Sequence, residues 1–284
     1  MSNKVIGKLS DFALTPFYRN IDLFSSCVSF PVKSSVLFQL ILKGKISAGP
    51  VSALSWIELK KNGCSSLSDF GLFVNPYITE SVLPCDPISN LAALSHAPYI
   101  LLTRKPLDEH ENICLGVDPD IVSSGLEVVL MAKLLLSTRW EVEHEINCEL
   151  NLSDDAWLVQ GGPYFPARTE HFFGFRYAYD MLGEWYRWKK IPFMLYRWAV
   201  SPGVGEEERE ELVCALRRTL ELNLRDLANI AGREASHHDL DRSNMLSYLK
   251  IFGHRFGLWN KTVDDSFEQL ASLVEDIELP ALST

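Results

Sequence analysis

The stretch Tyr179-Asp-Met-Leu-Gly-Glu-Trp185, followed by Ile191-Pro-Phe-Met-Leu-Tyr-Arg-Trp198, is the part of the sequence that decides the fold. We predict a helix over residues 179–189 and a long extended run over residues 192–200. A helix that feeds directly into a strand is typical of a chain that crosses back over a sheet.

The N-terminal part of the chain repeats this order of elements. The pattern predicts a strand at 5–9, a helix at 36–42, a strand at 46–49 and a helix at 51–62. This alternation favours parallel pairing with crossover helices. Residues 64–95 are rich in Ser, Pro and Asp, and we expect loops and short strands there.

The rest of the chain predicts a second set of strands and a helical end. Buried strands are expected at 99–102, 113–117 and 156–159, with a strong helix at 123–136. Helices are expected at 206–230, at 242–252 and after Thr262. The fold class is therefore α/β.

Composition excludes several classes of protein. The 284 residues are 47% hydrophobic and 11% aromatic, enough for one core or two. The formal net charge of −10 argues against a nucleic-acid partner, because phosphate contacts need a clustered basic surface.

The spacing of the cysteines and the lengths of the apolar runs indicate the cellular compartment. The six cysteines are scattered and form no close C-x-x-C pair, so we expect buried, reduced thiols. No apolar run approaches the roughly 20 residues of a membrane span, and residues 1–8 do not resemble a signal peptide. We expect a cytoplasmic protein with no membrane partner.

Several strings resemble the chorismate dehydratase family of the futalosine route to menaquinone. The paired strings at 179–185 and 191–198 resemble the family's Y-D-L-G-E-E-W and L-P-F-V-F-A-V-W. Lys43-Gly-Lys-Ile-Ser-Ala-Gly-Pro-Val-Ser52, Leu101-Leu-Thr-Arg-Lys-Pro-Leu107 and Asp118-Pro-Asp-Ile-Val-Ser-Ser124 are similar to other family segments. The resemblance spans nearly the whole chain.

This resemblance implies a two-lobed periplasmic-binding-protein type II fold. Each lobe would be a mixed, mostly parallel sheet flanked by helices, with the ligand in the cleft between the lobes. Residues 1–93 and 199–284 would form lobe 1, and residues 94–198 lobe 2. The implied reaction is the cofactor-free dehydration of chorismate to 3-[(1-carboxyvinyl)oxy]benzoate.

The chain departs from the family pattern at three positions. Ala13 stands where the family has Asn, and Gly161 stands where the family motif L-I-G-D has Asp. A family serine corresponds to Pro98. A non-catalytic binding protein on the same fold is one alternative that these losses favour. The other is a sibling enzyme that forms 1,4-dihydroxy-6-naphthoate.

Serines at predicted helix starts are candidate ligands for the substrate carboxylates. Ser52 precedes one predicted helix, and Ser123 and Ser124 open another, where free N–H groups and the helix dipole favour an anion. Plain N-capping is the alternative for these serines. Ser10 is a further candidate substrate contact.

Asp11, next to the lost amide, is the candidate catalytic residue, as a base or a polar contact. Capping of a local turn is the alternative. Arg197 is a candidate bidentate partner of a carboxylate, or else a surface arginine between aromatic neighbours. A dianionic substrate also requires a positive site in this acidic chain, and the cations to examine are Lys8, Lys33, Arg168 and Arg197.

Other kinds of site have little support. His237-His238-x-x-Asp241 suggests a metal only weakly, because the stretch is also typical of a polar loop that caps a helix. Nucleotide, dinucleotide and serine-hydrolase motifs are absent from the sequence. We expect neither a metal nor a cofactor. The sequence gives no indication of the oligomeric state.

Overall fold

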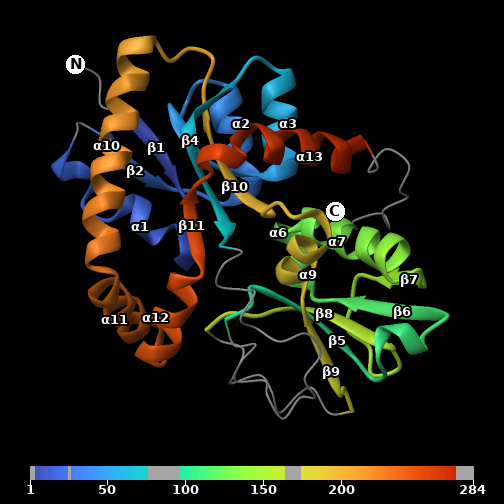
Figure 1. Cartoon of the computed structure of the whole chain (residues 1–284). Coiled ribbons are helices and arrows are strands. Elements are labelled where there is room, and N and C mark those ends of the chain that lie inside the picture. Colours follow the sequence, from blue (N-terminus) through green and yellow to red (C-terminus); the bar gives the residue numbers. More distant parts are fainter. Residues whose placement is uncertain (1–3, 25–26, 76–95, 164–173, 273–284) are drawn as a thin grey trace. The chain divides into compact units, whose positions relative to one another are not determined.

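The computed structural model describes residues 4–24, 27–75, 96–163 and 174–272, and these form two compact units (Figure 1). Unit 1 takes the chain up to Phe73 and the segment Met194–Phe267. Unit 2 takes Val74–Phe193 and the residues from Glu268 onward. The chain therefore passes between the units at 73–74, 193–194 and 267–268, whereas the sequence predicts crossings at 93–94 and 198–199.

Unit 1 is built on a six-stranded sheet with the order β11-β4-β10-β3-β1-β2. β1 is parallel to β2 and β3, and β10 is antiparallel to β3 and β4. The strands are β1 (Lys4–Lys8), β2 (Cys27–Pro31), β3 (Ala48–Ser52), β4 (Ser65–Val74), β10 (Met194–Val200) and β11 (Phe252–Arg255).

Helices cover both faces of this sheet, and successive side chains of β10 point to opposite faces. Arg197 lies on the face covered by α3 and α13, where it contacts the Trp56 ring and Asp264. Trp198 lies on the face of α1, where its ring is 5.3 Å from the ring of Phe17. The helices are α1 (Thr15–Tyr18), α2 (Ser34–Leu42), α3 (Ala53–Lys61), α10 (Glu206–Arg225), α11 (Leu227–His238), α12 (Arg242–Lys250) and α13 (Asn260–Ser272).

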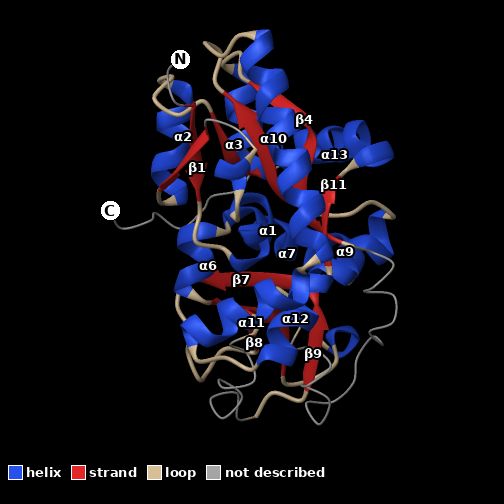
Figure 2. Cartoon of the chain, turned by 90° about the vertical axis from the view of Figure 1, so that its left-hand side faces the viewer, coloured by secondary structure: helices blue, strands red, loops and turns tan. Residues whose placement is uncertain are grey.

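Close packing of α2 depends on a glycine in β1. A Cβ atom at Gly7 would collide with the side chain of Leu37, which is fully buried. α2 and α3 therefore lie close against the strands of unit 1 (Figure 2). Both helices follow a strand whose carboxyl end points toward the helix N-terminus.

Unit 2 contains a five-stranded sheet with the order β7-β6-β8-β5-β9. β6 is parallel to β7 and β8, and β5 is antiparallel to β8 and β9. The strands are β5 (Tyr99–Thr103), β6 (Asn112–Val117), β7 (Glu143–Asn147), β8 (Ala156–Gln160) and β9 (Tyr177–Asp180).

The helices of unit 2 are α6 (Pro119–Ser124), α7 (Leu126–Leu134), the π-helical turn η5 (Leu135–Arg139) and α9 (Met181–Lys189). The helix predicted at 123–136 corresponds to α7 and the start of η5, but it also includes the end of α6, which the prediction did not separate. Asp118 caps α6 and Pro119 occupies its first position, so the helix begins before Ser123. Gly125 then separates α6 from α7.

The prediction of an α/β fold with two sheets is confirmed, with two corrections. Parallel pairing does not dominate, because each sheet has both parallel and antiparallel pairs among the described strands. The sequence predicts loops and short strands from residue 64 onward, but one long strand, β4, covers Ser65–Val74. Residues 76–95 lie outside the described part of the chain.

Candidate functional site

The carboxyl edge of β1, β2 and β3 gathers most of the predicted site residues of unit 1. Because these strands are parallel, their carboxyl ends lie at one edge of the sheet. Ser10 and Asp11 follow β1, and Ser52 ends β3. In sheets of this kind, ligands bind outside the carboxyl ends of the strands. We call this part of the molecule the carboxyl edge.

Asp11 is half-buried and is held in a tight turn. Its Oδ1 accepts a hydrogen bond from the Ala13 N–H at 2.9 Å, which caps the 3₁₀ helix Phe12–Leu14. The side chain of Tyr196 also forms a hydrogen bond with it. Burial raises the pKa of Asp11, while both hydrogen bonds act in the opposite direction. The predicted turn capping is confirmed, and a carboxylate with a raised pKa is also a stronger base.

Tyr196 is a site residue that sequence reasoning missed. It lies near the start of β10, opposite Ser52 of β3, and its side chain reaches Asp11. β10 is antiparallel to β3, so its beginning lies beside the carboxyl end of β3. Only the pairing of distant strands brings these three residues together. No local signal in the sequence indicates it.

Ser52 caps α3, as the alternative interpretation predicted. Its Oγ accepts a hydrogen bond from the Ser55 N–H at 3.4 Å and donates to the Ser55 Oγ at 3.2 Å. The side chain is 8% exposed. Contact of Ser52 with a substrate stays a prediction, as does that of Ser10, which is exposed.

The carboxyl edge favours an anion. Lys8 ends β1 and is exposed, with its Nζ 5.8 Å from the centre of the Tyr18 ring. Lys33 follows β2, is exposed, and is the N-cap residue of α2. The N-termini of α2 and α3 add partial positive charge at the same edge. Two lysines and two helix N-termini therefore lie at the carboxyl edge, the same edge of the sheet that Asp11 follows.

Arg197 has a different place from the one the sequence suggests. Its side chain is fully buried, and its Nη2 lies 2.8 Å from the Oδ2 of Asp264 in α13. The Trp56 indole also donates a hydrogen bond to Asp264, at 3.2 Å. The alternative of a surface arginine is wrong because this guanidinium is inside unit 1. Substrate contact stays a prediction, and Arg168 lies outside the described residues.

Ser123 and Ser124 are the last two residues of α6, and their side chains lie outside what the structure describes. They do not stand at a helix N-terminus, so the capping expected of them is wrong. Asp118 caps α6, and Gly125 precedes α7 without a side-chain cap. Their contact with a substrate stays a prediction.

The side chains of the segment 179–185 join several elements of unit 2. Tyr179 Oη accepts a hydrogen bond from the Leu107 N–H at 3.0 Å, and Asp180 caps α9. Burial raises the pKa of Asp180 to about 6. The buried Glu184 pairs with Arg139 at 2.6 Å and also with Arg187, which ties α9 to η5.

Two of the three departures from the family pattern, Ala13 and Gly161, have clear structural consequences. Ala13 is 1% exposed, so the side chain at this position packs in the core of unit 1. A Cβ atom at Gly161 would collide with the carbonyl oxygen of Ala97, so this backbone excludes an aspartate there. Within the described turn at residues 11–14, the carboxyl side chain is that of Asp11.

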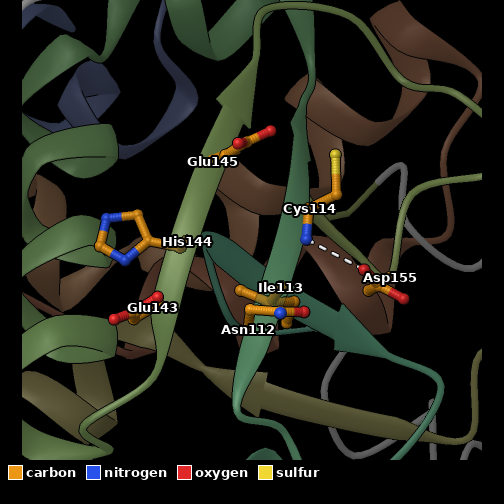
Figure 3. Close-up of a pocket in the computed structure, with 7 residues that line it drawn as sticks. All are labelled: Asn112, Ile113, Cys114, Glu143, His144, Glu145 and Asp155. Carbon is orange, nitrogen blue, oxygen red and sulfur yellow. Dashed lines mark hydrogen bonds between the residues drawn. The ribbon is translucent and has the colours of Figure 1, made fainter.

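A pocket of about 480 Å³ lies on unit 2, and none of the predicted site residues is among those that line it. It lies over the adjacent strands β6 and β7, and the Cys114 N–H donates to Asp155 at 3.0 Å (Figure 3). Its lining residues are Asn112, Ile113, Cys114, Glu143, His144, Glu145 and Asp155. Three carboxylates with no lysine or arginine among the lining residues make it unsuited to an anionic ligand.

No group of His, Cys, Asp and Glu within the described residues is arranged to hold a metal ion. His237 and His238 end α11, and Asp241 caps α12 by accepting from the Asn244 N–H at 2.8 Å. The predicted helix cap is therefore confirmed for Asp241.

Comparison with known families decides the relationship of the chain. Residues 119–271, more than half of the sequence, match the family described as menaquinone biosynthesis. The chain belongs to the menaquinone biosynthesis family. This match runs from α6 of unit 2 to α13 of unit 1. No curated protein sequence matches this family member.

Solved structures confirm the periplasmic-binding-protein fold of this family member. Protein AF1704 from Archaeoglobus fulgidus is 13% identical, with a TM-score of 0.66, over 97% of this chain and 99% of its own. The periplasmic aliphatic sulphonate binding protein SsuA from Escherichia coli is 12% identical, with a TM-score of 0.62, over 97% and 88%. The Candida albicans CA3427 gene product, of generic periplasmic binding protein fold, is 11% identical, with a TM-score of 0.59, over 99% and 92%.

Each helix in the described part of the chain is too short or too polar to cross a bilayer.

Proposed function

We propose that this protein is a chorismate dehydratase that acts in menaquinone biosynthesis. The observation that carries the proposal is the carboxyl edge, which Asp11, Lys8, Lys33 and the N-termini of α2 and α3 share. Membership of the menaquinone biosynthesis family limits the chemistry to this pathway. A biosynthetic role of this kind is also the basis for proposing a cytoplasmic location.

The substrate matches the charge of this edge. Chorismate carries two carboxylates and a ring hydroxyl, so its site needs donors for anions and a group that moves a proton. The sulphonate recognised by the Escherichia coli neighbour is likewise an anion. We propose that Lys8, Ser10 and the N-terminus of α3 at Ser52 bind one carboxylate of chorismate.

Asp11 is proposed to take the ring proton as the hydroxyl group leaves as water. Loss of one ring hydrogen and the hydroxyl converts chorismate to 3-[(1-carboxyvinyl)oxy]benzoate and water, so the atoms balance without a cofactor. Formation of the aromatic ring supplies much of the driving force. Orientation and electrostatic support are then the main tasks of the protein.

Two other functions remain as outcomes of the test. A non-catalytic binding protein is favoured by Gly161, because its backbone leaves no room for the family carboxylate. A sibling enzyme of the pathway would instead form 1,4-dihydroxy-6-naphthoate from a cyclic intermediate.

The test is to incubate the purified protein with chorismate and to follow the substituted benzoate by absorbance and mass. Turnover above the rate without protein supports the dehydratase. Binding without turnover points to the non-catalytic protein, and absence of both contradicts the proposed substrate.

Asp11→Asn tests the role of the carboxylate, with Asp22→Asn as a matched control on an exposed aspartate. We expect Asp11→Asn to bind chorismate and to lose turnover by roughly 10²–10⁴-fold, the usual contribution of a general base. Full turnover in Asp11→Asn would instead assign the proton transfer to the enolpyruvyl carboxylate of the substrate.

A further inference from the structure

His254, from the far end of the sequence, packs against the turn that holds Asp11. It lies in β11, the strand that flanks β4, and is 5% exposed. Its imidazole forms a hydrogen bond with the backbone of Ala13. The ring of Phe17 in α1 meets it edge-on, with the ring centres 5.4 Å apart. His254 therefore joins an edge strand of unit 1 to the segment after β1.

One ring nitrogen of His254 forms the hydrogen bond with Ala13, and the other has no hydrogen-bond partner among the described residues. His254 Nε2 is buried without a hydrogen-bond partner in the described part of the chain, which leaves Nδ1 to bond Ala13. An imidazole with its proton on Nδ1 donates to a carbonyl oxygen and needs no partner charge. Burial lowers the pKa of His254 to about 4, so the ring is neutral at physiological pH.

Ala13 connects His254 to Asp11. The Ala13 N–H donates to Asp11 Oδ1, and the Leu14 N–H donates to the Asp11 carbonyl at 3.1 Å. The hydrogen bond from His254 to the Ala13 carbonyl holds the same turn, residues 11–14, from its other side. The Ala13 carbonyl shares its peptide group with the Leu14 N–H, so a rotation of the Ala13–Leu14 peptide would break the contact with His254 and also the hydrogen bond from Leu14 that closes the turn on Asp11.

We propose that His254 is a positioning residue that sets the orientation of Asp11 through the Ala13–Leu14 peptide, which closes the turn. This inference rests on the proposed function, in which Asp11 moves the proton. His254 acts through the turn, without contact to the substrate. Misplacement of a reacting group by about 1 Å costs on the order of a hundredfold in rate, so the effect is measurable.

The test compares three variants of the full-length protein. His254→Phe keeps the ring against Phe17 and removes the hydrogen bond, whereas His254→Asn keeps a donor close to the position of Nδ1. His237→Asn is the control, because His237 is an exposed histidine at the end of α11. For each variant, kcat and KM for chorismate are measured together with the thermal midpoint.

We expect His254→Phe to lower kcat by roughly 10–100-fold with little change in KM. His254→Asn and His237→Asn should stay within about threefold of the wild type. Wild-type kcat in a folded His254→Phe would overturn the proposal. Equal loss of kcat in the Asn and Phe variants would also overturn it, because a donor near the position of Nδ1 would then give no rescue.

A readout independent of turnover separates this proposal from the proposed function. In ¹⁵N-labelled protein, the His254 ring should be the Nδ1–H tautomer, and the amide signals of residues 11–14 should move in His254→Phe but much less in His254→Asn. An Nε2–H tautomer, or turn amides unmoved in His254→Phe, contradicts the positioning role. If the wild type has no turnover but these shifts appear, the proposed reaction fails while the positioning of Asp11 stands.

Discussion

The ion pair of Arg197 with Asp264 gives the sharpest prediction about stability. The guanidinium is fully buried, while the Asp264 side chain is 17% exposed. Burial lowers the pKa of Arg197 and raises that of Asp264, so for both partners the cost of leaving water outweighs their attraction. Loss of one partner should therefore lower the free energy of unfolding, whereas the intact pair contributes little to it.

Asp264→Asn leaves a buried cation without its charge partner, and Nε and Nη1 of Arg197 already have no hydrogen-bond partner in the described residues. We expect a loss of about 3–5 kcal/mol in the free energy of unfolding. Arg197→Met leaves an Asp264 that water reaches and that the Trp56 indole contacts, so the expected loss is about 1–3 kcal/mol. The double variant should lie within about 1 kcal/mol of the wild type.

The assay is urea unfolding followed by tryptophan fluorescence and far-ultraviolet circular dichroism. The two single variants and the double variant are compared at the same pH and salt concentration. An Arg197→Met variant less stable than Asp264→Asn would refute the reasoning. A double variant that loses the sum of the two single losses would refute it as well, because additive losses mean that the two side chains have no coupling energy.

Three further predictions concern titration and accessibility. Because the folded-state pKa of His254 is lowered from 6.5 to about 4, its stabilising contribution is complete above pH 6.5. It is lost as the pH falls toward 4, by on the order of 3 kcal/mol, and unfolding of His254→Asn should lack this slope. Asp180 has the opposite sign, because its pKa is raised from 3.8 to about 6 and its contribution is lost as the pH rises through 6. Asp180→Asn keeps a capping oxygen, so it should be about 1–3 kcal/mol more stable than the wild type at pH 8 but not at pH 4, and equal differences at both would contradict this. Cys214 is exposed and should react first with a thiol reagent in the native protein, while Cys27 and Cys64 should react only on unfolding, as peptide mass analysis can check.

Much of the fold could be predicted from local patterns, because the strands and helices have clear apolar spacing. The helix α2 and the strands β5, β6 and β8 lie close to their predicted ranges. The length of β4 was not predicted, because three of its first four residues, Ser65-Ser-Leu-Ser, are polar, and pairing with β10 keeps the strand extended. Here the tertiary pairing overrides the weak local preference.

The start of α6 had a signal that the prediction did not use. Asp118 followed by Pro119 is a typical cap and first helical residue. Placing the start at Ser123 moved two serines to a helix N-terminus where they do not stand. A wrong helix start therefore led directly to a wrong capping assignment.

The candidate site was predicted only in part. Ser10, Asp11 and Ser52 follow strands that the sequence reveals, so their common edge could be predicted. Tyr196 and His254 meet this edge only through strands paired across most of the chain. Their contacts depend on sheet order, which a single sequence does not give.

The cysteines show a similar limit. Cys27 and Cys64 are buried, as expected, whereas Cys214 on α10 is exposed, so the prediction of buried thiols is wrong there. Cys85 lies outside the described residues. The position of a cysteine on a helix face depends on which side packs, and α10 packs through Leu212, Leu216 and Leu220.

The location of chorismate on the protein tests the central claim most directly. ¹⁵N-labelled Asp11→Asn, expected to bind without turnover, is titrated with chorismate while the backbone amide signals are followed. The account predicts saturable shifts at Ser10, Ser52 and Tyr196, on the carboxyl edge of unit 1. Shifts confined to the acidic pocket on β6 and β7, or no shifts at all, would contradict it.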